Sequence, residues 1–384
     1  MRKRKISLII LMIAVLQTIV SGCWNYREVD RLSIVAGIAV DKGVKEQYSV
    51  TVEVIRIGSS KNEVMKSEII SAEGKTLFDA FRNIISISGK RLYWSHTKVV
   101  ILSQEIAGEG VSKVLELYNR DTETREDVHV LISQEKSARE IFTGQPIGVS
   151  ILSFTLDEIL DNQVSLSKAP KVDILRFDIE SQAEGVSPVI PAIRLQQVEG
   201  KKVPQIIGTA IIKDDKLAGF LDSEETKDLL FIRDEIQGGI LVEEMHEEEE
   251  PTFVSLEIFG NDTKVTMLVK ENDISVNLDL KTSVAISEVN GAGDFAEEEN
   301  LKKLQRNAQD TLKTRLETLI LKMQKDYNAD VFGFSSKLWQ DNARVFKGVN
   351  DRWDDVFREL KVTVRSEVLI KNSAILSKPI GEGE

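Results

Sequence analysis

A single cysteine, Cys23, is the feature that most constrains how this 384-residue chain can fold. No intramolecular disulfide can form, so each domain must be held together by packing and polar contacts. The chain is long, and 42% of its residues are hydrophobic, which is enough for two or three domains with their own cores. The sequence therefore predicts a multidomain protein stabilised by apolar cores without cross-links.

The residues before Cys23 have the layout of a signal peptide. Residues 2–5 are all basic, residues 6–20 form an apolar run, and a small Ser-Gly pair follows at 21–22. A helix that spans a membrane needs about 20 apolar residues, and this run is shorter. We therefore predict that residues 1–22 are a signal peptide and are removed.

Residues 20–23, with the sequence Val-Ser-Gly-Cys, resemble the lipobox of bacterial lipoproteins. In that motif, small residues admit the signal peptidase and the cysteine thiolate takes a diacylglycerol. The resemblance implies a lipid anchor on Cys23, with palmitate as an acyl chain, on the outer face of the cytoplasmic membrane. Each buried methylene contributes about 0.8 kcal/mol, so two or more acyl chains hold a protein stably. An ordinary signal peptide followed by an incidental cysteine is the alternative.

The chain is acidic, with a formal net charge of −12 at pH 7. Removal of residues 1–22 takes away four basic residues and no acidic one, which leaves a charge of −16. Such a body is repelled by nucleic acid phosphates and by anionic lipid headgroups. We therefore expect no nucleic acid partner, and contact with the membrane through the lipid.

The first segment after the leader alternates between strand and helix patterns. Apolar residues at every second position predict a β-hairpin over 31–57. Thr76 is typical of a helix N-cap, because apolar residues at helical spacing follow it. Further strands are predicted at 97–102 and 128–132. This alternation favours an N-terminal α/β domain over residues 23–150.

The middle segment, residues 151–240, is less regular. Prolines interrupt its short apolar runs and predict edge strands or loops there. These are Pro170, Pro188, Pro191 and Pro204. A clearer hairpin is predicted over 206–221, followed by a helix that Ser223 caps and that runs to about Ile236.

The last segment, residues 251–384, combines strands with the clearest helix of the chain. Apolar residues at three- and four-residue spacing predict a helix over 301–327, with one apolar face that packs across the preceding sheet. A second helix is predicted over 353–360. Strands are predicted at 254–258, 265–269, 274–280 and 362–370. The predicted fold class is α+β or mixed α/β, in three domains with mixed or antiparallel sheets and packed helices.

Motifs for catalysis, metal or cofactor binding do not emerge from the sequence. The only histidines are His96, His129 and His246, and no Gly-x-Ser-x-Gly elbow is present. Structural zinc is not expected, since the one cysteine is assigned to lipid. The acidic run at 243–250 lacks the spaced, turn-forming ligands of a calcium loop, and the glycines at 291–293 lead into acidic residues that would repel phosphate. We predict a protein that is not an enzyme and that has no metal or cofactor.

Two polar segments allow more than one interpretation. His96 is either a binding or acid/base residue, or a hydrogen-bonded residue that opens a strand, and the second reading is favoured. The segment 120–125 either binds an anion or forms an internal ion-pair network. Its neighbouring carboxylates favour the network.

Two stretches, the first of which begins inside the lipobox, resemble the mature start of the Ger(x)C lipoproteins, the C subunits of spore germinant receptors. These are Gly-Cys-Trp-Asn-Tyr-Arg-Glu-Val-Asp-Arg-Leu at 22–32 and Ile-Val-Ala-Gly-Ile-Ala-Val-Asp-Lys at 34–42. Further matches to the family pattern are 88–90, 92–99, 119–121, Arg125, 208–210, 216–219, 328–334, Trp353 and Phe357. The chain departs from the pattern at 25–26, where the family often has an acidic and a basic residue, and at 371–373, which lacks a glycine often found there.

The resemblance implies a receptor with a membrane-spanning A subunit, a permease-like B subunit and this lipidated C subunit, in the inner membrane of the dormant spore. It also implies a mixed α/β fold and no enzymatic activity. Our hypothesis is a subunit required for nutrient-triggered germination through interaction with the A and B subunits. The alternative is a solute-binding lipoprotein that captures a small nutrient. Such proteins usually have two similar lobes around a cleft, and no internal repeat is visible here. An envelope hydrolase is the third hypothesis.

Overall fold

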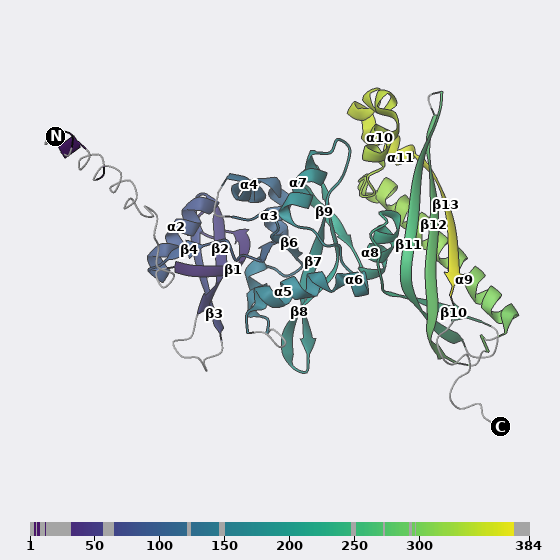
Figure 1. The fold of residues 1–384 in the computed structure, drawn as a ribbon, viewed down its shortest axis with the longest axis horizontal. Coiled ribbons are helices and arrows are strands. Elements are labelled where there is room, and N and C mark those ends of the chain that lie inside the picture. The colour runs from purple at the N-terminus through teal and green to yellow at the C-terminus, as the bar shows by residue number, and fades with distance from the viewer. Residues whose placement is uncertain are drawn as a thin grey trace.

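The computed structural model describes residues 4, 6–7, 12, 32–56, 65–120, 124–145, 150–246, 251–271, 273–291, 294–295 and 297–371. These residues form two bodies side by side along the long axis of the molecule, each built on one β-sheet (Figure 1). The predicted signal peptide, apart from four single positions, and Cys23 lie outside the described residues. None of the described helices combines the length and the apolar content that crossing a bilayer requires.

The N-terminal sheet is mixed. Its neighbouring strands follow the order β3-β2-β1-β5-β6-β7-β8-β9, and β4 also pairs with β1. The strands are β1 (Leu32–Lys42), β2 (Tyr48–Arg56), β3 (Lys66–Gly74), β4 (Arg91–Tyr93), β5 (Val99–Leu102), β6 (His129–Ser133), β7 (Val189–Val198), β8 (Lys201–Lys213) and β9 (Lys216–Leu221). The central strands β1, β5, β6 and β7 are parallel, and antiparallel pairs flank them. The two predicted hairpins are confirmed, and strands from both sides of the boundary predicted at residue 150 share this one sheet.

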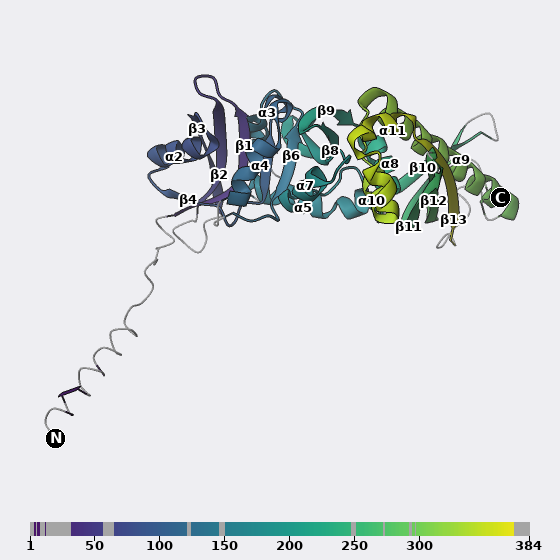
Figure 2. The same cartoon turned by 90° about the horizontal axis from the view of Figure 1, so that it is seen from above.

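Helices cover both faces of the N-terminal sheet (Figure 2). They are α2 (Leu77–Ser88), α3 (Gln104–Glu109), α4 (Ser112–Arg120), the 3-10 helix η2 (Ala138–Thr143), α5 (Leu152–Asp161), α6 (Gln163–Leu166) and α7 (Ile174–Gln182). Along β5, Val100 and Leu102 belong to the core beneath α2 and α4, whereas Val99 and Ile101 belong to the core beneath α5. Thr76 caps α2 as predicted, because its hydroxyl accepts a hydrogen bond from the Asp79 amide. Burial of the parallel strands on both faces is the usual state of such strands.

Pro191 corrects the prediction that prolines limit the middle segment to edge strands or loops. It lies in β7, which pairs with β6 on one side and with β8 on the other. The register of the β7–β8 ladder shifts between Pro191 and Ile193. A bulge removes the demand for a ladder hydrogen bond at one residue, so a residue without an N–H is accepted inside the sheet.

The C-terminal sheet has the strand order β10-β11-β12-β13, with β12 and β13 parallel and the other pairs antiparallel. The strands are β10 (Ile240–Met245), β11 (Thr252–Lys270), β12 (Asp273–Asn290) and β13 (Lys361–Ile370). The prediction of separate strands at 254–258 and 265–269 is wrong, because both belong to β11. A bulge between Ile258 and Gly260 keeps the strand continuous while it interrupts the apolar alternation.

The helix α9 (Glu298–Lys322) packs across one face of this sheet, as predicted. Its buried stripe includes Leu304, Leu312 and Leu316, and the helix continues into a π-turn over Met323–Tyr327. Two further helices complete this body, α10 (Phe334–Lys347) and α11 (Trp353–Glu359). Mixed sheets with packed helices give the α+β class that the sequence predicts.

The helix α8 (Ser223–Ile232) lies between the two bodies. It contacts β8 and β9 on one side and α9 and β11 on the other, and every residue from Thr226 to Ile232 is buried. Its N-cap is Asp222, not Ser223 as predicted, because the Asp222 carboxylate accepts from two amides while Glu225 accepts from the Asp222 amide. The helix also ends four residues earlier than predicted. A helix buried on all sides packs the two bodies into one unit.

Candidate functional site at the junction between the sheets

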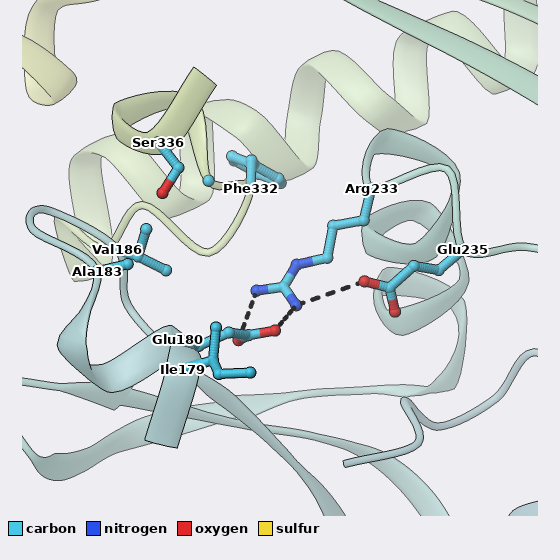
Figure 3. Close-up of a pocket in the computed structure, with 9 residues that line it drawn as sticks. Ile179, Glu180, Ala183, Val186, Arg233, Glu235, Phe332 and Ser336 are labelled. Carbon is cyan, nitrogen blue, oxygen red and sulfur yellow. Dashed lines mark hydrogen bonds and ion pairs between the residues drawn. The ribbon is translucent and has the colours of Figure 1, made fainter. Parts of the chain in front are cut away.

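Arg233, at the C-terminal end of α8, is the centre of the first polar network at the junction (Figure 3). Its side chain is only 7% exposed. Nη1 and Nη2 donate to the two carboxylate oxygens of Glu180 in α7, at 3.0 and 3.3 Å. Nε donates to the Val331 carbonyl at 2.5 Å. One guanidinium therefore holds α7 of the N-terminal body and the segment 328–334 of the C-terminal body.

A second arginine balances the charge of this network. Arg176 donates to Glu180 at 3.0 Å and to Glu235 at 2.5 Å. Burial raises the pKa of Glu180, but the charges of Arg233 and Arg176 outweigh burial, and the net effect is a pKa below the ordinary value. Two arginines and two glutamates neutralise one another, and removal of any one of them would leave a largely buried charge without its partner.

A cavity of about 250 Å³ opens beside Arg233. Its lining is half apolar, and its charged groups are those of the network just described. The lining residues are Ile179, Glu180, Ala183, Val186, Arg233, Glu235, Phe332, Gly333 and Ser336. Because these charges already pair with each other, the cavity presents no unmatched charge to an ionic ligand.

Asp330 organises the segment 328–334, which the family resemblance singled out. Its carboxylate accepts from the Phe334 and Ser335 amides at 3.0 and 2.8 Å and from the indole N–H of Trp353 at 3.1 Å. Burial raises the pKa of Asp330 above its ordinary value, although these hydrogen bonds lower it. The Asp330 carbonyl also accepts from the Ser187 amide. This residue therefore ties α10 and α11 to the N-terminal body.

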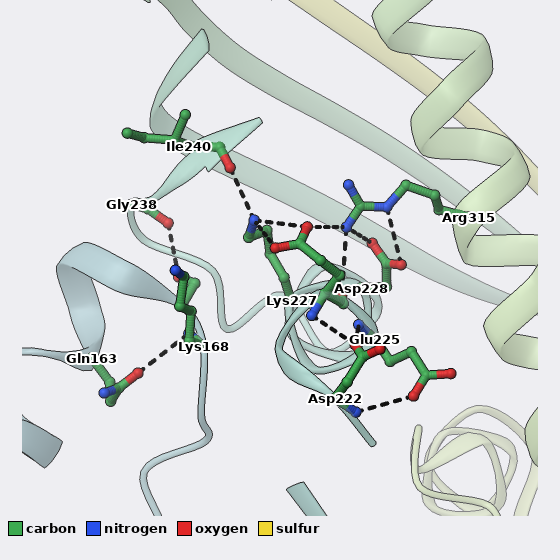
Figure 4. Close-up of polar contacts among 11 residues, drawn as sticks. Gln163, Lys168, Asp222, Glu225, Lys227, Asp228, Gly238, Ile240 and Arg315 are labelled. Carbon is green, nitrogen blue, oxygen red and sulfur yellow. Dashed lines mark hydrogen bonds and ion pairs between the residues drawn. The ribbon is translucent and has the colours of Figure 1, made fainter. Parts of the chain in front are cut away.

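A second polar network joins α8 to α9 (Figure 4). Arg315 of α9 lies 2.8 Å from Oδ1 of Asp228 and 3.1 Å from a carboxylate oxygen of Glu224. Burial raises the pKa of Asp228 to about 6, despite the opposing charge of Arg315. Lys227 donates to Glu224 and to the Ile240 carbonyl at the start of β10. The helix thus binds α9 and β10 through charged groups that are themselves mostly buried.

The three histidines do not come together. His96 is exposed, its ring lies 6.0 Å from that of Tyr93, and β5 begins only at Val99, so His96 does not open the strand as interpreted. His129 is buried in β6, with Nε2 3.4 Å from Asp157 and with no hydrogen-bond partner for Nδ1 among the described residues. His246 is exposed beside Glu244.

Clusters suited to a metal ion are absent from the described part of the chain, where no three His, Cys, Asp or Glu residues lie together. The residues 247–250 of the acidic run and residues 121–123 lie outside that part. Arg125 pairs with Asp127, with Nε 2.7 Å from Oδ1, which agrees with an ion-pair interpretation of this region.

Carboxylates that cap distant helices were missed from the sequence. Glu53 of β2 accepts from the Leu152 and Ser153 amides at the start of α5, at 2.9 and 2.8 Å. Asp41 of β1 accepts from the Ala138 and Arg139 amides at the start of η2, at 2.6 and 2.9 Å. Each carboxylate lies almost 100 residues from its helix, so no local pattern could have revealed it.

Comparison with known proteins defines the class. A family model described as "Spore germination protein N-terminal domain" matches residues 25–195, and one described as "Spore germination B3/ GerAC like, C-terminal" matches residues 207–374. These two matches cover most of the chain and make it a spore germination protein. It belongs to the Ger(x)C family, the C subunits of spore germinant receptors, as the resemblance in the sequence implied.

Individual relatives match over nearly their whole length. The chain is 24% identical to spore germination protein B3 of Bacillus subtilis (strain 168) over 352 residues, covering 88% of this chain and 90% of the relative. It is 22% identical to spore germination protein KC of the same organism over 395 residues, covering 94% of each. The crystal structure of the GerBC protein superposes with a TM-score of 0.58 at 22% identity, over 91% of this chain and all of that one. The fold is therefore shared with GerBC.

Proposed function

We propose that this chain is a non-enzymatic, lipid-anchored subunit of a spore germinant receptor. It is required for nutrient-triggered germination and acts by binding the membrane-spanning A-type and permease-like B-type subunits. The observation that carries the proposal is the match of the two family models along almost the whole chain.

The geometry of the described residues supports a binding role. The charged groups of the junction pair with one another around α8, and Glu53 and Asp41 are occupied as helix caps. A nucleophile needs a base within hydrogen-bond reach, and the dispersed histidines offer no such pair. The two bodies are therefore suited to present a rigid surface to partners.

The lipid on Cys23 would keep this surface close to the bilayer, on the outer face of the spore inner membrane. The first described strand begins at Leu32. Nine residues span at most about 30 Å, even when fully extended. An anchor at Cys23 thus confines the N-terminal body to the immediate neighbourhood of membrane subunits.

The anchor is tested with Cys23→Ala, using labelling with a palmitate analogue and membrane fractionation. We expect labelling to be lost, membrane retention to weaken, and germination with nutrients to fall in part, since partner subunits still hold some of the protein. Ser21→Ala is the matched control, because it keeps a small residue two positions before Cys23 and should leave labelling intact. Labelling that persists in Cys23→Ala would contradict the anchor.

The partners are tested by copurification of the A- and B-type subunits with the full-length chain from detergent-solubilised spore membranes. We expect both subunits to accompany the wild-type chain. A wild-type chain that is present at normal abundance and purifies without either subunit would contradict the proposed function.

A further inference from the structure

The face of the C-terminal sheet opposite α9 carries large apolar side chains that are well exposed in the described part of the structure. Five of them gather at the end of the sheet where β10 pairs with β11, and these are 39–61% exposed. Leu268, at the other end of β11, is 37% exposed. The five are Ile240, Val242, Phe253, Phe259 and Leu369. A sheet packed on one side usually has polar residues on the other, so this group departs from the expected pattern.

The strand register places these side chains on one face. On β11, Val254, Leu256 and Ile258 are buried, so the residues between them point away from α9. Val242 is paired with Ser255, and Leu369 is paired with Ser283, which is itself paired with Gly260 beside Phe259. Phe259 continues this alternation after the buried Ile258, and it is the most exposed of the group.

Three glutamates are interleaved with these apolar residues. Glu257 is paired with Ile240, Glu244 with Phe253, and Glu288 with Ser255. All three are exposed, and among the described residues none forms an ion pair with a lysine or arginine; Glu244 lies 3.4 Å from His246. We call the five apolar residues and these three glutamates the outer patch.

The other half of the same face is different. There Arg365 pairs with Asp279 at 3.1 Å, and Lys281 lies 3.7 Å from Glu367. Asp279 and Glu367 in this half are therefore matched by basic residues of the neighbouring strand. The unmatched glutamates therefore belong to the apolar half and not to the sheet as a whole.

We propose that the outer patch docks another subunit of the germinant receptor, through an apolar surface of that subunit flanked by lysine or arginine. This inference rests on the proposed function. A second copy of the chain would place three carboxylates against three, and an anionic bilayer would repel them, whereas basic residues of a partner would pair with them. The apolar side chains supply the anchors of the contact, and the glutamates supply its specificity.

The contact is tested by photo-crosslinking in spore membranes that contain the full-length, lipidated chain. A photoreactive phenylalanine analogue replaces Val242 or Phe259 in the outer patch. Thr363 is the matched control, since it is exposed on the same face but lies in the half with paired charges. We expect crosslinks to an A- or B-type subunit from both patch positions, at about ten times the yield from Thr363.

Charge reversal gives a second measurement. The double variant Glu257→Lys/Glu288→Lys should reduce copurification of the partner by about tenfold and should make the remaining binding less sensitive to salt. Glu367→Lys, also exposed but in the other half, should leave copurification unchanged. Equal losses in both variants would overturn the proposal.

Three crosslinking results would also overturn the proposal while leaving the proposed function intact. They are crosslinks only between copies of the chain, crosslinks only to residues 372–384 of the same chain, and no crosslink although the wild-type chain copurifies with its partners. Copurification of the wild-type chain with its partners is measured before the crosslinking. Its failure would overturn the proposed function and this docking surface together.

Discussion

The two sheets of this protein differ in how many of their faces are covered by helices. The N-terminal sheet is covered by helices on both faces, and β5 and β6 are buried along their whole length. The C-terminal sheet is covered by α9 on one face, and its strands alternate between buried and exposed residues. Parallel strands joined by helices require two covered faces, whereas an antiparallel hairpin does not. The uncovered face is therefore where this fold leaves surface for a partner.

The bodies also differ in what their buried polar contacts hold. In the N-terminal body, Glu53 and Asp41 each cap the start of one helix. In the C-terminal body and at the junction, Asp330, Arg233 and Arg315 join different helices to one another. Apolar cores lie beneath the helices of both bodies, so substitutions of core residues and of these polar residues should act through different physical causes.

The largest expected effect is in the doubly covered sheet. Ile101→Ala opens a cavity in the centre of β5, where the side chain is fully buried, and should lower the free energy of unfolding by about 4 kcal/mol. Val242→Ala, on the uncovered face, should change it by less than about 0.5 kcal/mol. Urea denaturation measures both. Similar losses in the two variants would break the contrast between the sheets.

A somewhat smaller loss is expected from Asp330→Ala. The substitution leaves two buried amides and the Trp353 indole N–H without an acceptor, which should cost about 3 kcal/mol. Trp353 fluorescence should shift, and hydrogen exchange should rise first in α10 and α11. Asp326→Ala is the control, because Asp326 is exposed in the neighbouring turn and its loss should have little effect. Unchanged exchange in α10 would contradict the role given to Asp330.

The pH dependence of the junction tests the buried charges of α8. Asp228 has its folded pKa raised to about 6, so between about pH 4 and pH 6 the unfolded chain releases this proton while the folded chain keeps it. The free energy of unfolding should therefore fall as pH rises through this window, by up to roughly 3 kcal/mol. In Asp228→Asn this contribution should be absent. A free energy of unfolding that changes with pH in parallel in the wild type and in Asp228→Asn would contradict this prediction.

The smallest effect distinguishes two neighbouring residues at the start of α8. Asp222→Ala removes the carboxylate that accepts from two amides and should cost about 1 kcal/mol. Ser223→Ala should cost almost nothing, although the sequence alone favours Ser223 as the cap. Thermal or urea denaturation of the two variants decides between them. A larger loss for Ser223→Ala would refute the observed cap.

Local patterns predicted the elements that depend on neighbours in the chain. The hairpin of β1 and β2, the Thr76 cap and the long helix α9 all follow from spacing that a short window contains. Pro191 and the bulge in β11 misled the prediction, because both are accommodated by pairing with another strand. The helices α5 to α7 were not predicted, because the prolines between and after them favoured edge strands or loops in that segment.

The junction could be predicted only in part. The family resemblance identified residues 328–334 as a matching segment. It did not indicate that Asp330 caps α10 or that the Val331 carbonyl accepts a hydrogen bond from Arg233. Arg233 and Glu180 carry no distinguishing local signal, since they lie 53 residues apart. Pairing across such distances is decided by the packing of the two bodies, which a sequence window does not contain.

The parallel pairing of β12 with β13 has a consequence for the order of synthesis. Between these two strands the chain makes α9, α10 and α11, and only then returns to complete the sheet. Val364 and Val368 of the last strand are buried, and this strand also packs against α9. During synthesis, α9 therefore lacks part of its packing surface, and the edge of β12 lacks its hydrogen-bonding partner, until residue 370 has been added. A polypeptide that stops short of this point lacks the strand that closes its second body, so this body reaches its stable state only after β13 has been made.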